Sequence, residues 1–267
     1  MSKKPTNTST KLTNTSTVTK SRSKKNNRSS FCSKYYVFWK PYDVLSQFKP
    51  AQGSSADTLA SYIDVKDIYP MGRLDRDSEG LLLLSDDGLL QHKLCDPRFE
   101  HWRSYLVQVE KVPNADALEK LRTGVVIKGQ LTRPAQVTLL EQEPDLPSRN
   151  PPIRVRKTVE TAWLHLSLTE GMNRQVRRMT AAVGHPTLRL VRHSIRLNQH
   201  LEITLNGLEQ GQMRAFNQDE REAVNTVKQK QAQRATRRAR PTQKGPKKAQ
   251  KPKPHNIRNN KKGKHND

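Results

Sequence analysis

The sequence predicts an α+β domain built on a mixed, mainly antiparallel sheet flanked by helices, between residues 35 and 217. Three observations lead to this class. Strand-like apolar runs outnumber helix-like runs, regular helical crossovers do not separate them, and polar basic segments enclose the whole pattern. We expect these enclosing segments, residues 1–34 and 218–267, to be disordered tails, because they hold too few large apolar side chains to form a core. The one alternative is a fraying helix near Val227 to Arg240.

The first expected strand covers residues 35–39, whose sequence YYVFW is aromatic and β-branched. Lys40 and Pro41 end it, because proline lacks the N–H that a strand ladder needs. The wholly apolar run from Leu81 to Leu84 predicts a strand that is buried on both faces. A short helix at 88–94 follows it.

The middle of the domain shows patterns typical of strands and of a helix. Residues 105–109 and 161–168 alternate between two faces and predict strands. A helix is expected from Ala115 to Thr123, since Asn114 is a good N-cap and Gly124 a good C-terminal stop.

The positive charge lies in the tails. Residues 1–34 carry nine Lys or Arg and no acid, and residues 223–267 carry fifteen and one acid. Removing these charges of +9 and +14 from the total of +24 leaves about +1 for the residues between them. Flexible basic tails pair loosely with phosphates, which predicts a polyanionic partner. The alternative is that the tails only keep the protein in solution.

Several classes of protein are disfavoured. Cys32 and Cys95 are too few for a disulfide framework or a four-ligand zinc site. The N-terminus lacks the apolar stretch of a secretory signal, and the longest apolar run is far shorter than the roughly 20 residues that span a bilayer. We expect a cytoplasmic monomer that has no contact with a membrane.

A charged loop, MGRLDRDSEG at 71–80, stands directly before the buried apolar run. A loop beside such a strand lies against the core, where a carboxylate is costly unless it meets a positive group. We therefore expect one of Asp75, Asp77 or Glu79 to be paired. The alternative is that all three are solvated turn residues.

A second notable string, EGMNRQVRRM at 170–179, begins a helix after Asn173 with apolar residues at spacings of three and four. Arg174, Arg177 and Arg178 recur at the same spacings, so they lie close together. The alternative is an ordinary solvated basic face.

The pattern GRLD, three further positions and GLLLL resembles the central motif of pseudouridine synthases of the ribosomal small-subunit synthase A family and its large-subunit relatives. This resemblance implies the pseudouridine synthase fold and makes Asp75 the catalytic aspartate. The string at 170–179 resembles the family's late motif, which implies a salt bridge from Arg177 to that aspartate. Arg174, Gln175 and Arg178 would flank the path of the RNA.

Other strings support the same resemblance. Tyr105, in RSYLV, is similar to the tyrosine of the family's K-x-Y strand, which packs against the target base; a strand tyrosine of this kind is otherwise ordinary core. The strings at 39–48, 150–157 and 183–190 look like the large-subunit synthase E branch. They indicate large-subunit (23S) ribosomal RNA or its precursor as the substrate.

The implied reaction breaks the bond between uracil N1 and the ribose, turns the base and rejoins it through C5, so we expect no metal and no cofactor. The carboxylate acts as nucleophile or as base. Expected RNA contacts are Arg73, Arg76, Arg154, Arg156, Lys157, Arg174, Gln175 and Arg178. The competing interpretation is a non-catalytic RNA-binding or ribosome-assembly factor with the same fold.

Overall fold

The structure is a computed structural model that describes residues 33–50, 52–53, 55–153 and 159–239. Its main sheet contains β1 (Tyr35–Lys40), β2 (Tyr69–Pro70), β3 (Glu79–Ser85), β4 (Arg103–Glu110), β7 (Gln136–Leu139), β8 (Thr161–Leu168), β9 (Thr187–Arg196), β10 (Glu202–Thr204) and β11 (Met213–Ala215). The helices are α1 (Gly88–Cys95), α2 (Ala115–Thr123), α3 (Gln175–Ala182) and α4 (Gln218–Ala239). A separate hairpin pairs β5 (Val126–Ile127) with β6 (Gln130–Leu131).

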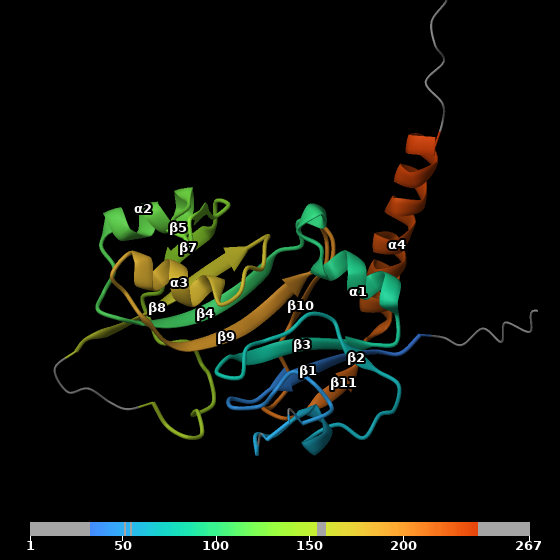
Figure 1. Cartoon of the computed structure of the whole chain (residues 1–267), viewed down its shortest axis with the longest axis horizontal. Coiled ribbons are helices and arrows are strands. Elements are labelled where there is room, and N and C mark those ends of the chain that lie inside the picture. The colour runs from blue at the N-terminus through green and yellow to red at the C-terminus, as the bar shows by residue number, and fades with distance from the viewer. Residues whose placement is uncertain (1–32, 51, 54, 154–158, 240–267) are drawn as a thin grey trace, which may run out of the picture. The chain divides into compact units, whose positions relative to one another are not determined.

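The strand order is β11-β1-β3-β9-β4-β8-β7, with β2 added beside β3 and β10 beside β9 (Figure 1). Every pairing in this sheet is antiparallel except that of β3 with β9. The predicted mixed, mainly antiparallel α+β fold is therefore confirmed. Within the described ranges, no helix has both the length and the apolar character needed to cross a bilayer.

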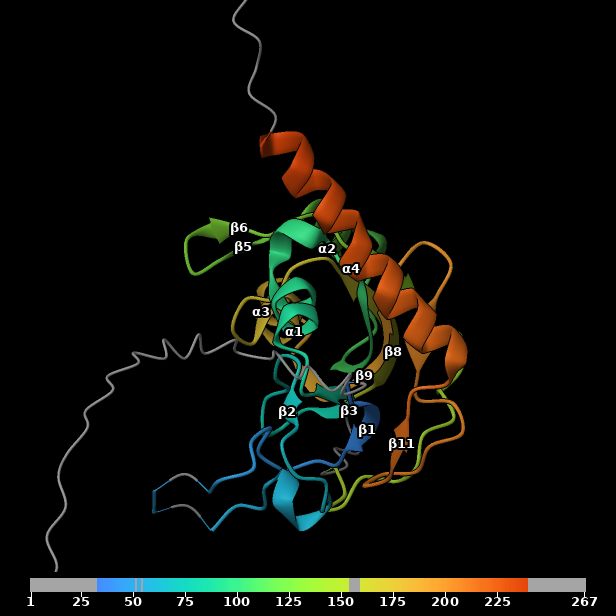
Figure 2. The ribbon, with the colours of Figure 1, turned by 90° about the vertical axis from the view of Figure 1, so that its right-hand side faces the viewer.

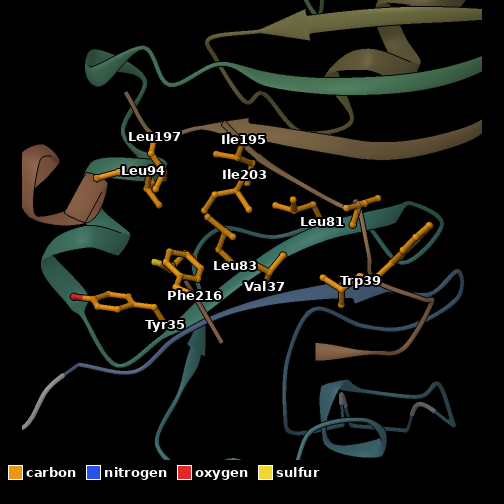
Figure 3. Close-up of a cluster of buried hydrophobic side chains, with 14 of the residues drawn as sticks. Tyr35, Val37, Trp39, Leu81, Leu83, Leu94, Ile195, Leu197, Ile203 and Phe216 are labelled. Carbon is orange, nitrogen blue, oxygen red and sulfur yellow. The ribbon is translucent and has the colours of Figure 1, made fainter. Parts of the chain in front are cut away.

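β3 is buried on both faces, as its sequence predicts. Leu81 and Leu83 belong to one core cluster together with Val37 (Figure 3). Leu82 and Leu84 belong to a second cluster on the opposite face of the strand. All seven residues of β3 are buried, so this strand gives the charged loop before it a fixed end.

The other half of the sheet carries α2 and α3 on one face (Figure 1). α2 begins and ends as expected: the Asn114 side chain accepts a hydrogen bond from the Ala117 N–H at 2.9 Å, and Gly124 follows the last turn. α3 buries Val176 and Met179 against the same cluster. This packing fixes the start of α3 above β9.

The two halves of the sheet meet where β3 and β9 run parallel, pairing Glu79 with Val191 and Gly80 with Arg192. Gly80 has φ +107°, and a Cβ built there would lie 2.7 Å from the Arg192 backbone nitrogen and closer still to its carbonyl oxygen. Only glycine permits this approach. The contact places the 71–78 loop directly beside β9.

The structure differs from the prediction at the C-terminal side of the domain, where the sequence predicts a disordered tail from residue 218. α4 begins at Gln218 and buries Ala223 and Val224 in the core. Figure 2 shows α4 beside α1. The remaining residues of the predicted tails, 1–32 and 240–267, lie outside the described residues.

Polar contacts hold the first half of α4 in place. Lys228 forms an ion pair with Asp87, the N-cap of α1. The buried Lys93 ammonium donates hydrogen bonds to the Val227 and Lys228 carbonyls, at 2.6 and 3.0 Å. The basic composition did not reveal this docking, because Lys228, which we assigned to a solvated tail, pairs with the N-cap of α1.

Candidate active site

A pocket of about 440 Å³ opens between the loop before β3 and the loop before α3. Its lining comes from segments that are far apart in the sequence: residues 71–78, 103–105, 168–176 and 190–192, together with Cys95. The predicted site residues that line it are Arg73, Asp75, Tyr105, Arg174 and Gln175.

The loop that carries Asp75 is fixed by hydrogen bonds. The Ser46 hydroxyl donates to the Leu74 carbonyl at 2.8 Å and accepts from the Leu74 N–H at 3.1 Å. The Ser78 N–H closes a turn on the Asp75 carbonyl at 3.0 Å. The buried Lys40 ammonium donates to three carbonyls, including that of Arg76. Asp75 therefore occupies a defined position at the pocket.

Asp75 is partly open to solvent, with 37% of its side chain exposed. Its ion-pair contact is with Arg174, whose Nη1 lies 4.0 Å from Asp75 Oδ2. Asp75 thus has a guanidinium nearby, and a ligand in the pocket can reach its carboxylate.

Asp77, two residues later, is the carboxylate that both Arg174 and Arg177 contact. Arg174 donates to its two carboxylate oxygens at 2.9 and 2.8 Å, and Arg177 Nε lies 3.3 Å from Oδ2. Arg177 also donates to the Asp77 carbonyl at 2.6 Å. Burial raises the pKa of Asp77, but the Arg174 hydrogen bonds and the Arg177 charge outweigh it, so the pKa lies below its usual value. Asp77 is thus the paired carboxylate that the loop composition predicts.

The implied salt bridge from Arg177 to Asp75 differs from what the structure shows, since the carboxylate that Arg177 contacts is that of Asp77. The reason is the backbone at the start of α3. Arg174 precedes the helix in the left-handed region, with φ +53°, and this turn brings its guanidinium to the pocket. Arg177 lies deeper, with 13% of its side chain exposed, and acts on Asp75 only through longer-range electrostatics.

Tyr105 is half-buried on β4 and faces the pocket. On the neighbouring strand β9, Arg192 is its register partner and also lines the pocket. The sequence analysis missed Arg192, because one arginine in an alternating strand gives no signal of burial.

Gln175 has a different role from the expected RNA contact. It is buried, donates to Glu170 at 2.5 Å and accepts from the Met172 N–H at 2.8 Å. The Arg133 N–H donates to the same Glu170 oxygen at 2.8 Å. These bonds hold the rim of the pocket that precedes α3.

The remaining predicted RNA contacts are spread more widely. Arg73 is exposed at the pocket. Arg76 instead forms a two-pronged pair with Asp43, at 2.6 and 2.9 Å, and Arg178 turns back to Asn173. Neither of these two lines the pocket. Three further expected contacts lie outside the described residues: Arg154, Arg156 and Lys157.

With this fold and site in view, comparison with known proteins defines the class. Residues 34–182 match the RNA pseudouridylate synthase family, and the chain belongs to that family. It is an isomerase of the pseudouridine synthase class.

Particular relatives are similar over much of the domain. The chain is 58% identical over 156 residues to ribosomal large subunit pseudouridine synthase E of Xanthomonas axonopodis pv. citri (strain 306), covering 58% of this chain and 82% of the relative. It is 51% identical over 179 residues to the protein of the same name from Vibrio parahaemolyticus serotype O3:K6, covering 67% and 72%. Ribosomal small subunit pseudouridine synthase A of Vibrio cholerae is more distant, with 31% identity over 190 residues, covering 70% and 72%.

Among solved structures, one described as a crystal structure of pseudouridylate synthase has a TM-score of 0.58 and 24% identity, covering 72% of this chain and 74% of that chain. This likeness confirms the predicted pseudouridine synthase fold.

Proposed function

We propose that the protein converts a uridine of large-subunit (23S) ribosomal RNA to pseudouridine, as a member of the synthase E branch, with Asp75 as the catalytic carboxylate. The position of Asp75 carries this proposal: it lies on a fixed loop at the only part of the described surface where a carboxylate, Tyr105 and several arginines share one pocket. The names of the 58% and 51% identical relatives support the choice of RNA.

Two carboxylates line the pocket, and they differ in what they bind. One oxygen of Glu170, Oε1, accepts hydrogen bonds from the Arg133 N–H and from Gln175, so this carboxylate holds the rim. Asp75, among the described residues, makes a single ion-pair contact, at 4.0 Å from Arg174. Its oxygens are therefore available to a ribose, and we assign the chemistry to Asp75.

The reaction needs a charged carboxylate next to C1′ and C2′ of the target ribose. Asp75 either attacks C1′ or removes a proton from C2′, and in both cases the N1–C1′ bond breaks. Arg174 and Arg177 lie beside the loop and supply positive charge next to this carboxylate.

The target nucleotide must leave its stack to reach this pocket, which costs a few kcal/mol. Stacking of the base on Tyr105 offsets about 1–3 kcal/mol of this cost. Arg73, exposed at the pocket, is placed to contact RNA phosphate. We also propose that the protein acts as a monomer and, because its proposed substrate is ribosomal RNA, that it works in the cytoplasm.

The test compares Asp75→Asn with the parent in the full chain. Pseudouridines are mapped in ribosomal RNA from cells that lack the protein and from the same cells supplied with either form. We expect one large-subunit site to be missing without the protein, restored by the parent and not by Asp75→Asn. Binding of Asp75→Asn to the RNA should stay within about 3-fold of the parent, since the phosphate contacts remain.

Asp43→Asn is the matched control, because Asp43 pairs with Arg76 on the surface and does not line the pocket. This control should restore the site. If Asp75→Asn restored it as well, the protein would act as the competing non-catalytic RNA-binding factor.

A further inference from the structure

Arg192 lines the pocket and is the register partner of Gly80, at the end of the loop that carries Asp75. Only 4% of its surface is exposed, and it reaches the pocket from β9. Its Nε donates to the Leu81 carbonyl at 2.7 Å, which fixes the direction of the side chain. Tyr105 stands beside it on β4.

The guanidinium of Arg192 hydrogen-bonds Tyr105, but one of its nitrogens has no partner among the residues that the structure describes. Arg192 Nη2 is buried and makes no hydrogen bond within the described part of the chain. No carboxylate of the described residues lies within ion-pair distance of it. Burial lowers the pKa of Arg192, and Tyr105 opposes that effect. Arginine starts so far above neutrality that the guanidinium stays charged.

Arg189, on the same strand, shows how this fold treats a structural arginine. It is also buried, at 6% exposure. Its Nε and Nη2 donate to Glu79 at 2.9 Å each, and Nη2 also reaches the Pro147 carbonyl at 2.8 Å. A buried cation without such compensation is destabilising. The fold supplies full compensation for Arg189, whereas Arg192, which lines the pocket, keeps one buried nitrogen without a hydrogen bond among the described residues.

We propose that Arg192 contacts the substrate, and that its Nη2 donates a hydrogen bond to a carbonyl oxygen of the target uracil, O2 or O4. In this position it stabilises the negative charge that the base carries once it has left the ribose. The inference rests on the proposed function, and it adds a second catalytic residue to Asp75.

The chemistry explains why a buried cation is useful there. When the N1–C1′ bond breaks, its electron pair stays with uracil, and the negative charge spreads from N1 onto the carbonyl oxygens. The base then turns, C5 bonds to C1′, the C5 proton leaves and N1 gains a proton, so the product is an isomer. A fixed donor in a water-poor site stabilises such a charge far better than a donor in water does. Tyr105 holds the base above this donor.

The experiment uses the full chain and a synthetic RNA fragment that carries the mapped target uridine. Arg192→Met should lower the single-turnover rate about 10²-fold, as loss of one anion-stabilising donor does elsewhere, and leave the RNA Kd within about 3-fold. Its Tm should be unchanged or higher, because a poorly compensated buried charge is removed. Arg192→Lys, which keeps the charge, should recover part of the rate.

Arg189→Met is the matched control, because it removes a buried arginine of the same strand that lies outside the pocket lining. It should lower the Tm by leaving Glu79 unpaired, and the folded fraction should keep a rate near that of the parent. A purely structural Arg192 would behave like Arg189.

Thio-substituted substrates test the contact itself. Replacing O2 or O4 of the target uridine by sulfur should slow the parent on one of the two substrates, and Arg192→Lys should discriminate less between that substrate and normal RNA. A parent-like rate for Arg192→Met would overturn the inference. So would a fall in affinity that matches the fall in rate and reduces the salt slope by about one, since that result marks a phosphate contact. A parent that forms no pseudouridine would instead reject the proposed function.

Discussion

The segment from Asp75 to Glu79 carries three carboxylates, and its two ends use them differently. At the core end, Glu79 and Arg189 form an ion pair whose side chains are 1% and 6% exposed. At the pocket end, Asp75 and Arg174 are 37% and 42% exposed and lie 4.0 Å apart. Each end pairs a carboxylate with an arginine, but the packing around the two pairs differs.

This difference separates a structural pair from a reactive one. Both oxygens of Glu79 are taken by Arg189, and Gln210 donates to one of them as well. Asp75 keeps its oxygens available because Asp77 binds the nearby arginines in its place. Charge at a site is therefore a poor guide to function unless the partners of each oxygen are known.

The largest expected effect is at the pocket end. Asp75→Asn should reduce pseudouridine formation to the background of a protein-free sample, because the other described carboxylate that lines the pocket, Glu170, is held at the rim by Arg133 and Gln175. Its free energy of unfolding should change by less than about 0.5 kcal/mol, as expected for a loosely paired residue. Urea unfolding of the same samples checks this, and a loss of stability beside the loss of activity would break the comparison.

Glu79→Gln should show the opposite pattern. It leaves the Arg189 guanidinium buried without its counter-charge, which costs about 3–5 kcal/mol of stability. For a domain of this size the Tm should fall by roughly 10 °C. Thermal unfolding measures the loss, and the double variant Glu79→Leu with Arg189→Met should recover much of it. An unchanged Tm in the single variant would contradict the structural role.

The effect of Asp77→Asn should be intermediate between those of Asp75→Asn and Glu79→Gln. It frees Arg174 and Arg177 from their shared carboxylate, so both guanidinium groups shift relative to Asp75. Misplacement of such groups by about 1 Å reduces rates by up to roughly 10²-fold. Single-turnover kinetics should show a slower reaction with RNA affinity largely kept. A rate equal to that of the parent would show that Asp77 does not position the arginines.

The smallest expected effect is on the free energy of unfolding at low pH. The pKa of folded Asp77 is depressed, so its contribution to stability is full above the unfolded value of about 3.9 and is lost as the pH falls through the lower folded value. Between about pH 4 and pH 2 the parent should therefore lose more stability than Asp77→Asn does. Urea midpoints at pH 5, 4 and 3 measure this, with the two curves parallel above about pH 5.

Much of the fold is predictable from local patterns. The strand at 161–168 and the helix at 115–123 have the predicted bounds, since alternation and caps are local properties. The sequence analysis did not predict β9. It contains Arg189 and Arg192, and arginine normally indicates exposure. Their burial depends on Glu79 and on the pocket, both of which are distant in the sequence.

The candidate site was predictable where it depends on local patterns and not where it depends on residues that are distant in the sequence. The loop composition indicates a paired carboxylate, and the motif points to Asp75. The arginines pair with Asp77 because Arg174 adopts a left-handed backbone, which no local pattern reveals. For α4, the apolar residues Ala223, Val224 and Val227 recur at helical spacing, and that signal was outweighed by the surrounding basic composition.

The close approach at Gly80 has a consequence for how the two proposed catalytic groups keep their separation. The loop with Asp75 leads into Gly80, whose backbone rests on that of Arg192. Main-chain atoms of Gly80 and Arg192 thus help to set the distance between the acid and the guanidinium. Any larger residue at position 80 would push β3 and β9 apart and change the distance between Asp75 and Arg192.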